Sequence, residues 1–427
     1  ILMKKYILII LCCLTSFPLW SYNVNMIVEH YSVDQGLPNN TVNCTLKDRD
    51  GFIWFGTWYG LCCFDGVKFK TFNKQEHDSD VPPRKIQRIV EDKNGYIWVK
   101  TIDRKLYVFN KVTECFHAVY DDMKNYSENI QVIKLQNTAE GDVLLLTKDK
   151  NLLLAGVDEK GQVTIKILFD SRDEINKHDY TLKHHVLCET EEYISWIGTD
   201  YKVSAVHKGA ELASRPADFI TSKINSGDKD SFTSFFEDGR KVWVGDRAGI
   251  FYSIDVRTGL VNRYVLSEIK GAISNLLVTP AGYVYLSVAG QGTYEYDLAE
   301  RRLQKINTEM NDAMVTHAFI DQYDKIWFHE NEKALIYYDP LNHTAKRFPF
   351  TMFGKITTLY SEDAGERGLF FLSPAGEAWL FDREHAEMVY INKLKQLSND
   401  RANQQFYHLM LDNDGVLWLS SADKFCE

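Results

Sequence analysis

Two stretches of the chain carry acidic residues at the spacing that begins a calcium-binding loop. They are Asp48-Arg-Asp-Gly51 and Asp412-Asn-Asp-Gly415. A calcium loop also needs a glycine at its sixth position and a bidentate glutamate at its twelfth. Counted from Asp48, these positions hold Ile53 and Tyr59, so the sequence favours a hairpin turn over a calcium site.

Other residue types that could do chemistry give no firmer signature. His178, His184 and His185 have no cysteine or carboxylate at a ligand spacing, which favours loop histidines over a metal site. Gly290-Gln-Gly292 is a lone G-x-G with no helix pattern after it, unlike a dinucleotide site. No G-x-S-x-G or zinc-peptidase pattern is present. We therefore expect no catalytic residue, no metal and no cofactor, although carboxylates from different repeats could still meet.

The tryptophans recur at a regular spacing, which points to the elements behind these turns. Trp98 follows Trp54 by 44 residues, and Trp243 follows Trp196 by 47, each within a short aromatic and β-branched run. Longer intervals, such as Trp243 to Trp327, are close to twice that, and runs rich in Leu, Tyr or Phe stand at the missing positions. This repeat length, with short strand-like runs instead of helical periodicity, predicts propeller blades.

Each copy divides into four expected strands. In the first copy they cover residues 42–47, 52–57, 61–64 and 68–72. Asp50-Gly51 separates the first two, because a tight hairpin turn needs positive φ angles that these residues tolerate. The repeated tryptophan lies in mid-strand, where we expect it to be buried between neighbouring sheets.

With the runs rich in Leu, Tyr or Phe included, the chain has nine copies of the repeat. This exceeds the number of blades that usually closes one propeller. We expect an all-β fold: a seven-bladed β-propeller of four-stranded antiparallel blades over residues 22–345, then the first two blades of a second propeller over residues 346–427. Met26–Val33 is strand-like, and we expect it to complete the seventh blade as its outer strand. Ala345–Phe350 would open the second ring in the same way. Two blades leave an open sheet edge, so we expect the chain to be a piece of a longer protein.

The N-terminus has the pattern of an export signal. Lys4-Lys5 precede an apolar stretch over residues 6–14, and small or polar residues follow as far as Ser21. This predicts a signal peptide over residues 1–21, since a membrane span needs about 20 apolar residues. The remaining cysteines have no metal-type spacing, and we expect buried thiols: Cys44, Cys62, Cys63, Cys115, Cys188 and Cys426.

The overall charge argues against one class of partner. The chain has 59 acidic and 49 basic residues, a formal net charge of −10. Nucleic acids select basic surfaces, so we expect no nucleic-acid contact by this region.

Residues 31–72 resemble the two-component-regulator propeller repeat. In that repeat a Gly-Leu-Pro or Gly-Leu-Ser lead precedes the pattern V-x-x-I-x-x-D-x-x-G-x-I-W-x-G-T-x-x-G-L-x-x-[FY]-D-G. The matching positions are Gly36-Leu37-Pro38, Val42, Asp48, Gly51, Ile53-Trp54, Gly56-Thr57, Gly60-Leu61 and Phe64-Asp65-Gly66. Thr45 departs from the usual isoleucine but is also β-branched.

The resemblance implies the periplasmic sensor region of a hybrid two-component system. Such proteins have two seven-bladed propellers, an immunoglobulin-like domain, one transmembrane helix, and histidine kinase, receiver and DNA-binding domains. The implied partners are a glycan-derived oligosaccharide, the second propeller and downstream domains, and a second copy of the full-length protein. The implied location is the periplasm, with an anchor in the inner membrane and an output on carbohydrate-utilisation genes. Kinase activity would belong to the later domains, so we expect no enzyme activity in this chain.

Two other interpretations stay open: a propeller lyase or glycosidase, and a ligand-free scaffold for protein–protein contacts. Under the sensor interpretation, a sugar would meet the end of the propeller where loops follow the second strand of each blade. In the first copy this loop holds Trp58-Tyr59, two aromatics that could stack on a sugar or pack on the second propeller. The predicted ligand-binding residues are Trp58, Tyr59, Asp103, Arg104, Asp200, Tyr201, Asp246, Arg247 and Gln291. Lys148, Asp149, Glu330 and Asn331 align with the same end.

Overall fold

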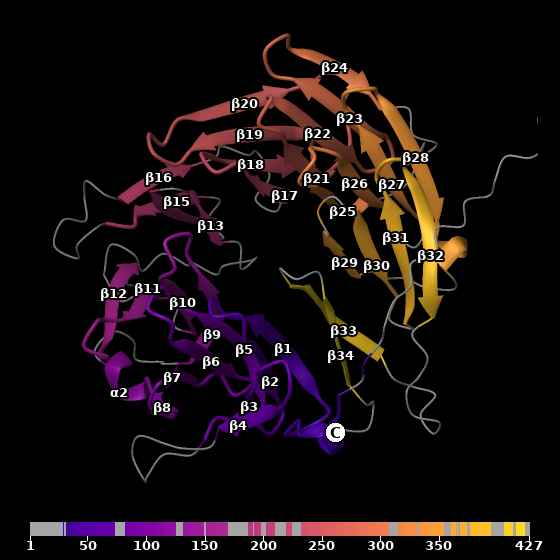
Figure 1. Cartoon of the computed structure of the whole chain (residues 1–427). Helices are drawn as coiled ribbons and strands as arrows, with labels where there is room; N and C mark the ends of the chain where they lie inside the picture. Colours follow the sequence, from indigo (N-terminus) through magenta and orange to yellow (C-terminus); the bar gives the residue numbers. More distant parts are fainter. Residues whose placement is uncertain are drawn as a thin grey trace, which may run out of the picture.

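The fold is all-β, as predicted. The computed structural model describes residues 29, 31–72, 82–124, 131–148, 151–169, 187–190, 192–197, 202–209, 219–223, 232–306, 315–330, 333–353, 360–363, 365, 368–373, 376–393, 405–412 and 416–422. Within these residues the chain forms eight four-stranded antiparallel sheets and one two-stranded sheet. Successive sheets follow one another around a central axis, with the first strand of each sheet innermost (Figure 1).

The first four sheets are regular apart from short connecting helices. Sheet one contains β1 (Val42–Lys47), β2 (Ile53–Thr57), β3 (Gly60–Phe64) and β4 (Phe69–Phe72). Sheet two contains β5 (Ile86–Glu91), β6 (Ile97–Thr101), β7 (Leu106–Asn110) and β8 (Cys115–Ala118). Sheet three contains β9 (Val132–Asn137), β10 (Val143–Thr147), β11 (Leu152–Val157) and β12 (Val163–Phe169). Sheet four contains β13 (Leu187–Glu189), β14 (Tyr193–Ile197), β15 (Lys202–His207) and β16 (Phe219–Lys223). The 3-10 helix η1 (Val33–Gln35) precedes sheet one, and α2 (Tyr120–Met123) follows β8.

The remaining sheets repeat the same order. Sheet five contains β17 (Phe232–Glu237), β18 (Lys241–Asp246), β19 (Ile250–Asp255) and β20 (Val261–Val265). Sheet six contains β21 (Ile273–Val278), β22 (Tyr283–Val288), β23 (Gly292–Asp297) and β24 (Arg302–Lys305). Sheet seven contains β25 (Val315–Ile320), β26 (Ile326–Glu330), β27 (Ala334–Asp339) and β28 (Thr344–Pro349), followed by the 3-10 helix η3 (Phe350–Phe353). Sheet eight contains β29 (Tyr360–Asp363), β30 (Leu369–Leu372), β31 (Glu377–Asp382) and β32 (Glu387–Lys393), and sheet nine contains β33 (Gln405–Leu411) and β34 (Leu417–Ala422).

The repeated tryptophan is a core residue, as predicted. Trp98, Trp243 and Trp327 are almost completely buried, and Trp54 is 3% exposed. The ring of Trp54 lies 5.5 Å from that of Phe109 in sheet two, centroid to centroid. Each tryptophan therefore fills the space between its own sheet and the next, which makes it unavailable to a ligand.

An aspartate before the second strand, buried in four of the five sheets named below, holds this tryptophan in place. Its Oδ2 accepts a hydrogen bond from the indole Nε1, at 2.7 Å for Asp48 and Trp54 and at 2.9 Å for Asp92 and Trp98. The same bond occurs between Asp238 and Trp243, Asp321 and Trp327, and Asp412 and Trp418. The other carboxylate oxygen accepts backbone N–H groups of the turn, as Oδ1 of Asp92 does from Asn94 and Tyr96. One side chain thus closes the turn and orients the core tryptophan.

Where the tryptophan is lost, the aspartate is lost with it. In sheets three and six the corresponding residues are Thr138 and Thr279, and the tryptophan positions hold Leu144 and Tyr285. The threonine Oγ1 still accepts the turn N–H group, at 3.1 Å from Asp142 in sheet three. Without an indole to bind, a second carboxylate oxygen would be buried without a partner, which is costly.

The glycine of the W-x-G pattern allows two sheets to approach. A Cβ atom on Gly56 would lie 2.4 Å from Cys44 Sγ and 2.6 Å from Ile86 Cγ2 of sheet two. The equivalent Gly245 is crowded in the same way by Ser234 and Ile273. Glycine is required here by contact between neighbouring sheets.

The predicted completion of the seventh sheet by the N-terminal segment was wrong. β28 pairs with β27 in antiparallel register, from Thr344 opposite Asp339 to Pro349 opposite Ala334. The outer position expected for Met26–Val33 is therefore filled by the chain itself, and the stretch Ala345–Phe350 does not open a second ring. A four-residue connection makes this local pairing entropically cheaper than pairing with a distant segment. Residues 26–28 and 30 lie outside the described residues.

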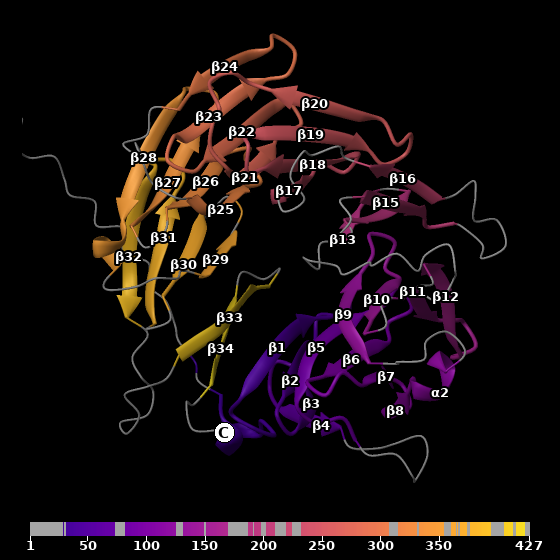
Figure 2. The same ribbon diagram turned by 180° about the vertical axis from the view of Figure 1, so that it is seen from behind.

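The ninth sheet packs on the first, as both ribbon views show (Figure 2). The Trp418 ring lies 5.8 Å from the rings of Phe55 and Phe64 and stacks on Tyr31 at 6.3 Å. The ninth sheet thereby covers this apolar face of the first sheet. The division of the chain at residue 345 stays a prediction, and β28 lies across that boundary. The number of blades in each ring of the complete protein also stays a prediction.

Candidate ligand-binding site

The strand order creates two different rims. The loop rim is the end of the propeller formed by two kinds of connection. One follows the second strand of each sheet, and the other leads into the first strand of the next sheet. The turn rim is the opposite end, formed by the hairpins after the first and third strands. The predicted ligand residues belong to the loop rim. Its described parts include residues 57–60, 82–85, 101–105, 246–249, 266–272 and 288–292.

Trp58 and Tyr59 lie together on the loop rim, as predicted. The turn that presents them is held by Thr57, whose Oγ1 accepts the backbone N–H groups of Tyr59 and Gly60 and donates to Gly60 O at 2.8 Å. Tyr59 is 58% exposed and Trp58 is partly buried. The Lys85 ammonium lies 5.0 Å from the centre of the Trp58 ring. Because the turn geometry depends on Thr57 and Gly60, neither aromatic is needed to form it.

Backbone hydrogen bonds join this turn to the next sheet. Trp58 N donates to Thr41 O, Lys85 N donates to Trp58 O at 2.8 Å, and Ile102 N donates to Lys85 O at 2.9 Å. The predicted residues Asp103 and Arg104 follow Ile102 directly. The loops of sheets one and two are therefore held next to each other.

Asp103 and Arg104 are both exposed on this rim. Arg104 has a φ of 68°, and its carbonyl oxygen accepts a hydrogen bond from Val132 N at the start of sheet three. Asp103 accepts a hydrogen bond from Thr101 and lies 3.4 Å from Lys105 Nζ. Burial raises the pKa of Asp103, but the Thr101 and Lys105 contacts outweigh it and hold the pKa below its ordinary value.

Asp246 has a structural position, unlike its neighbour Arg247. It is 2% exposed, and its Oδ1 accepts N–H groups from Ala248 and Ile250. Burial raises the pKa of its carboxyl group. Asp246 closes its turn as Thr57 does in sheet one, and a ligand at the rim could not contact it directly. Arg247 is exposed.

Gln291 and Glu330 also stabilise loops in this structure. Gln291 Oε1 accepts from Lys270 N at 2.7 Å, and its Nε2 donates to Glu268 O at 3.0 Å. Glu330 is 4% exposed and binds the Arg347 guanidinium at 3.1 Å. Asp149, Asp200, Tyr201 and Asn331 lie outside the described residues, while Lys148 is exposed.

The rim of sheet two also has a buried cation that the sequence analysis missed. Lys100 is 6% exposed, and its Nζ donates to Gln87 Oε1 at 2.7 Å and to Ile133 O at 2.8 Å. It occupies the position that glycine holds in sheets one and five. The change from "IWFGT" to "IWVKT" was visible in the sequence and could have identified it.

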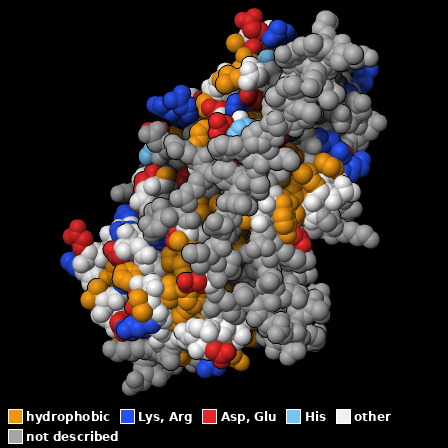
Figure 3. Space-filling view, turned by 45° about the vertical axis from the view of Figure 1, so that its right-hand side comes forward, with side chains coloured by type: hydrophobic (Ala, Val, Ile, Leu, Met, Phe, Trp, Pro, Cys, Tyr) orange, Lys and Arg blue, Asp and Glu red, His pale blue; other side chains and the backbone are white. Residues whose placement is uncertain are grey.

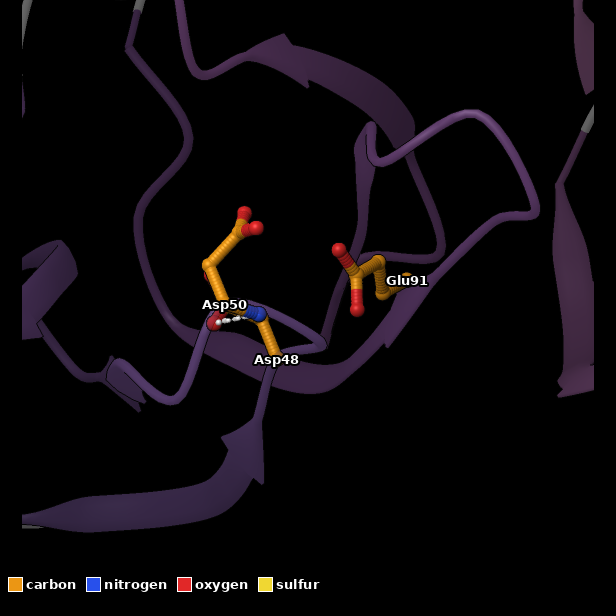
Figure 4. A group of neighbouring side chains, drawn as sticks. All are labelled: Asp48, Asp50 and Glu91. Carbon is orange, nitrogen blue, oxygen red and sulfur yellow. Dashed lines mark hydrogen bonds between the residues drawn. The ribbon is translucent and has the colours of Figure 1, made fainter.

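The calcium-like acidic cluster lies on the turn rim and already contains a cation. Ligand oxygens of Asp48, Asp50 and Glu91 lie within 4.8 Å of one another, with Glu91 coming from the neighbouring sheet (Figure 4). Lys111 Nζ binds all three, at 2.9, 2.9 and 2.8 Å. The lysine ammonium takes the place that a metal ion would have.

This arrangement recurs around the turn rim. A cation after the third strand of one sheet binds an acid in the first turn of the preceding sheet. Lys208 of sheet four binds Glu140 of sheet three at 2.8 Å. Arg383 of sheet eight binds Asp321 of sheet seven at 2.6 Å. These ion pairs connect neighbouring sheets.

Three of the cysteines are buried, as predicted. Cys44, Cys62 and Cys63 are at most 9% exposed, and burial raises the pKa of Cys44 and of Cys63 to about 12. Cys115 is partly exposed. Cys426 and the histidines proposed as weak metal candidates, His178, His184 and His185, lie outside the described residues.

The first repeat also has a counterpart among known families. Residues 36–59 match the family model described as two component regulator propeller. The predicted resemblance is confirmed over these residues, which end at the Trp58-Tyr59 loop. No curated protein sequence matches the chain.

Several solved structures are similar at low identity. One is the extracellular domain of a B. thetaiotaomicron protein described as a hybrid two component system, with 14% identity and a TM-score of 0.40 over 92% of this chain and 65% of that chain. A second such domain from the same organism has 15% identity and a TM-score of 0.35 over 92% and 57%. Virginiamycin B lyase from Staphylococcus aureus has 11% identity and a TM-score of 0.40 over 70% and 94%. The chain thus spans less than two thirds of the sensor-type domains, and likenesses of this size assign no residue roles.

Proposed function

We propose that this chain is the extracytoplasmic sensor region of a hybrid two-component histidine kinase and response regulator. In the proposal, the chain is exported by residues 1–21 and binds a glycan-derived oligosaccharide on its loop rim. Binding would control the expression of carbohydrate-utilisation genes through membrane-anchored later domains of a dimeric protein. The match of residues 36–59 to the two component regulator propeller family supports the sensor class. No helix in the described part of the chain has the length and apolarity to span a membrane.

The Trp58-Tyr59 loop carries the ligand part of the proposal. Tyr59 is 58% exposed on a turn whose hydrogen bonds are made by Thr57, so its ring is not needed for the fold. Aromatic side chains present rigid apolar faces at low entropic cost, which suits the apolar faces of sugar rings. Asp103 and Arg104, on the adjoining loop, would bind the polar groups of the sugar.

Calorimetric titration of the full-length sensor with a panel of neutral and acidic oligosaccharides tests this proposal. Saturable binding without product formation supports a sensor, whereas chromatographic detection of cleaved sugar would support a lyase or glycosidase. Absence of binding to every oligosaccharide would favour the scaffold interpretation. Trp58→Ala combined with Arg247→Ala is expected to weaken binding at least tenfold. Tyr390→Ala, an exposed tyrosine on the outer strand β32, is the matched control and is expected to bind normally.

A further inference from the structure

The inner part of the loop rim at sheets two and three carries unpaired positive charge. Arg88 lies on β5, Lys100 on β6, and Arg104 in the loop after β6. None of the three forms an ion pair with an acidic side chain in the described part of the chain. Since the chain as a whole has a net charge of −10, such a local excess of basic groups is not a general property of its surface.

Two of these cations face each other directly. Arg88 and Lys100 are register partners in the antiparallel pair of β5 and β6, so their side chains leave the same face of the sheet. Like charges in this position destabilise a sheet. Burial lowers the pKa of Lys100, and Arg104 and Arg88 lower it further.

Lys100 gives the strongest evidence of the three cations, because its side chain is almost completely buried. Its two acceptors, Gln87 Oε1 and Ile133 O, are both neutral oxygens. Buried charges in proteins are normally paired, because moving an ammonium out of water is costly. On the turn rim this rule is followed: Lys111, Lys208 and Arg383 each bind at least one carboxylate.

Charge is not separated in this way on the face that Figure 3 draws. On the face in Figure 3, acidic and basic side chains are both scattered over the described residues. The Arg104 loop also adjoins the proposed sugar platform, since its Ile102 donates its N–H group to Lys85 O and the Lys85 ammonium lies over the Trp58 ring.

We infer that Arg88, Lys100 and Arg104 bind a carboxylate or sulfate group, and hence that the ligand of this rim is an acidic sugar. Arginine binds such groups through paired N–H donors, and Lys100 offers a third N–H group after its two hydrogen bonds. The inference rests on the proposed function for the sugar to which the anion belongs. The binding of an anion by these three residues rests on the structure alone.

The test compares three probes at constant ionic strength: inorganic sulfate, galacturonate and uncharged galactose. Each is titrated into the chain while its thermal midpoint is measured. Sulfate or galacturonate is expected to raise the midpoint and galactose to leave it nearly unchanged. Arg88→Gln with Arg104→Gln is expected to weaken the anion effect at least tenfold in concentration. Arg302→Gln, an exposed cation on the outer strand β24, removes one charge far from the site and is expected to change nothing.

Three results would overturn the inference. The first is that neither anion changes the thermal midpoint of the unchanged chain. The second is that galactose raises the midpoint as much as the anions do. The third concerns Glu76, Asp78 and Asp80, which precede Pro82 and lie outside the described residues. If the anions stabilise the chain only after these acids are changed to Gln, Asn and Asn, then the cations are already neutralised.

A response to only one of the two anions would support the inference and identify the group as sulfate or carboxylate. Lys100→Met keeps the length of the side chain and tests its share. If this variant unfolds, the two arginine substitutions still decide the outcome, because both side chains are exposed. Anion binding together with failure of every oligosaccharide to bind would overturn the proposed function alone. Strong binding of neutral oligosaccharides only would overturn the inference alone.

Discussion

At sheets one and two, the two rims of this propeller use charged residues in opposite ways. On the turn rim, Asp92 binds an indole and two backbone N–H groups, and Lys111 binds three carboxylates. On the loop rim, Arg104 is exposed without an acidic partner in the described residues, and Lys100 is buried among neutral oxygens. Both rims belong to the same sheets and are built by the same repeat.

This difference separates residues that maintain the fold from residues that are available for binding. A polar group whose hydrogen bonds are all made inside the protein contributes to stability and has little left for a ligand. An unsatisfied group costs stability in the free protein, and that cost is recovered when a ligand binds. At these sheets the charged groups of the turn rim therefore hold neighbouring sheets together, whereas the cations of the loop rim are open to a partner.

The largest expected effect comes from breaking a turn-rim aspartate. Asp92→Ala leaves the Trp98 indole N–H and two turn N–H groups without acceptors in a buried site, which should cost roughly 2–5 kcal/mol of unfolding free energy. Urea denaturation of the purified chain measures this. Asp103→Ala, on the loop rim, is the matched control and should cost less than about 1 kcal/mol. Equal losses in the two variants would remove the distinction between the rims.

A smaller effect is expected when the central cation of the acidic cluster is removed. Lys111→Ala leaves Asp48, Asp50 and Glu91 close together without a positive charge, and should destabilise the chain by about 1–3 kcal/mol. The vacated cluster should then take up Ca²⁺ weakly, so millimolar Ca²⁺ should restore part of the thermal midpoint. The unchanged chain should show no Ca²⁺ effect. A calcium response of the unchanged chain would mean that the lysine does not hold this position in solution.

Much of this framework could be predicted from the sequence. The tryptophan spacing identified the sheets, and the Asp-Gly and Asn-Gly turns located the hairpins of the turn rim. The link between Asp92 and Trp98 was not predicted, because it depends on an indole N–H returning to a turn six residues earlier. The outer strand of the seventh sheet was assigned to Met26–Val33 because the pattern of one segment cannot show which strand it pairs with.

The loop rim was harder to predict for a related reason. The repeat pattern places Arg104 and Asp246 at the same end of their sheets, yet one is exposed and the other closes a buried turn. The position of a residue in the repeat predicts the rim on which it lies. The hydrogen bonds that its side chain makes depend on the geometry of its own turn. Lys100 could have been noticed as a departure from the glycine of the repeat.

We expect the interior between the two rims to be inaccessible to thiol reagents in the folded chain. Cys44, Cys62 and Cys63 are buried, and since burial raises the pKa of Cys44 and Cys63 to about 12, almost no thiolate forms at pH 8. Alkylation followed by peptide mass spectrometry should label these three only after unfolding, and Cys115 in the folded chain. Because their proton is held more tightly in the folded state, stability should fall as pH rises from about 9 to about 12. Fast labelling of Cys62 in the folded chain would show that sheet one opens readily.

The smallest effect on stability is expected at the loop rim itself. Trp58 lies only four residues after Trp54, but it is partly buried and contacts a lysine instead of the core of the next sheet. Trp58→Ala should therefore cost less than about 1 kcal/mol, the size of an exposed cation–π contact, whereas Trp54→Ala should cost about 3–5 kcal/mol. Urea denaturation of the two variants measures the difference between two tryptophans of one repeat. If Trp58→Ala is as destabilising as Trp54→Ala, the ring packs as a structural residue and the loop rim loses one of the two aromatic rings proposed to stack on a sugar. A small loss of stability together with at least tenfold weaker oligosaccharide binding would establish the loop rim as the binding surface.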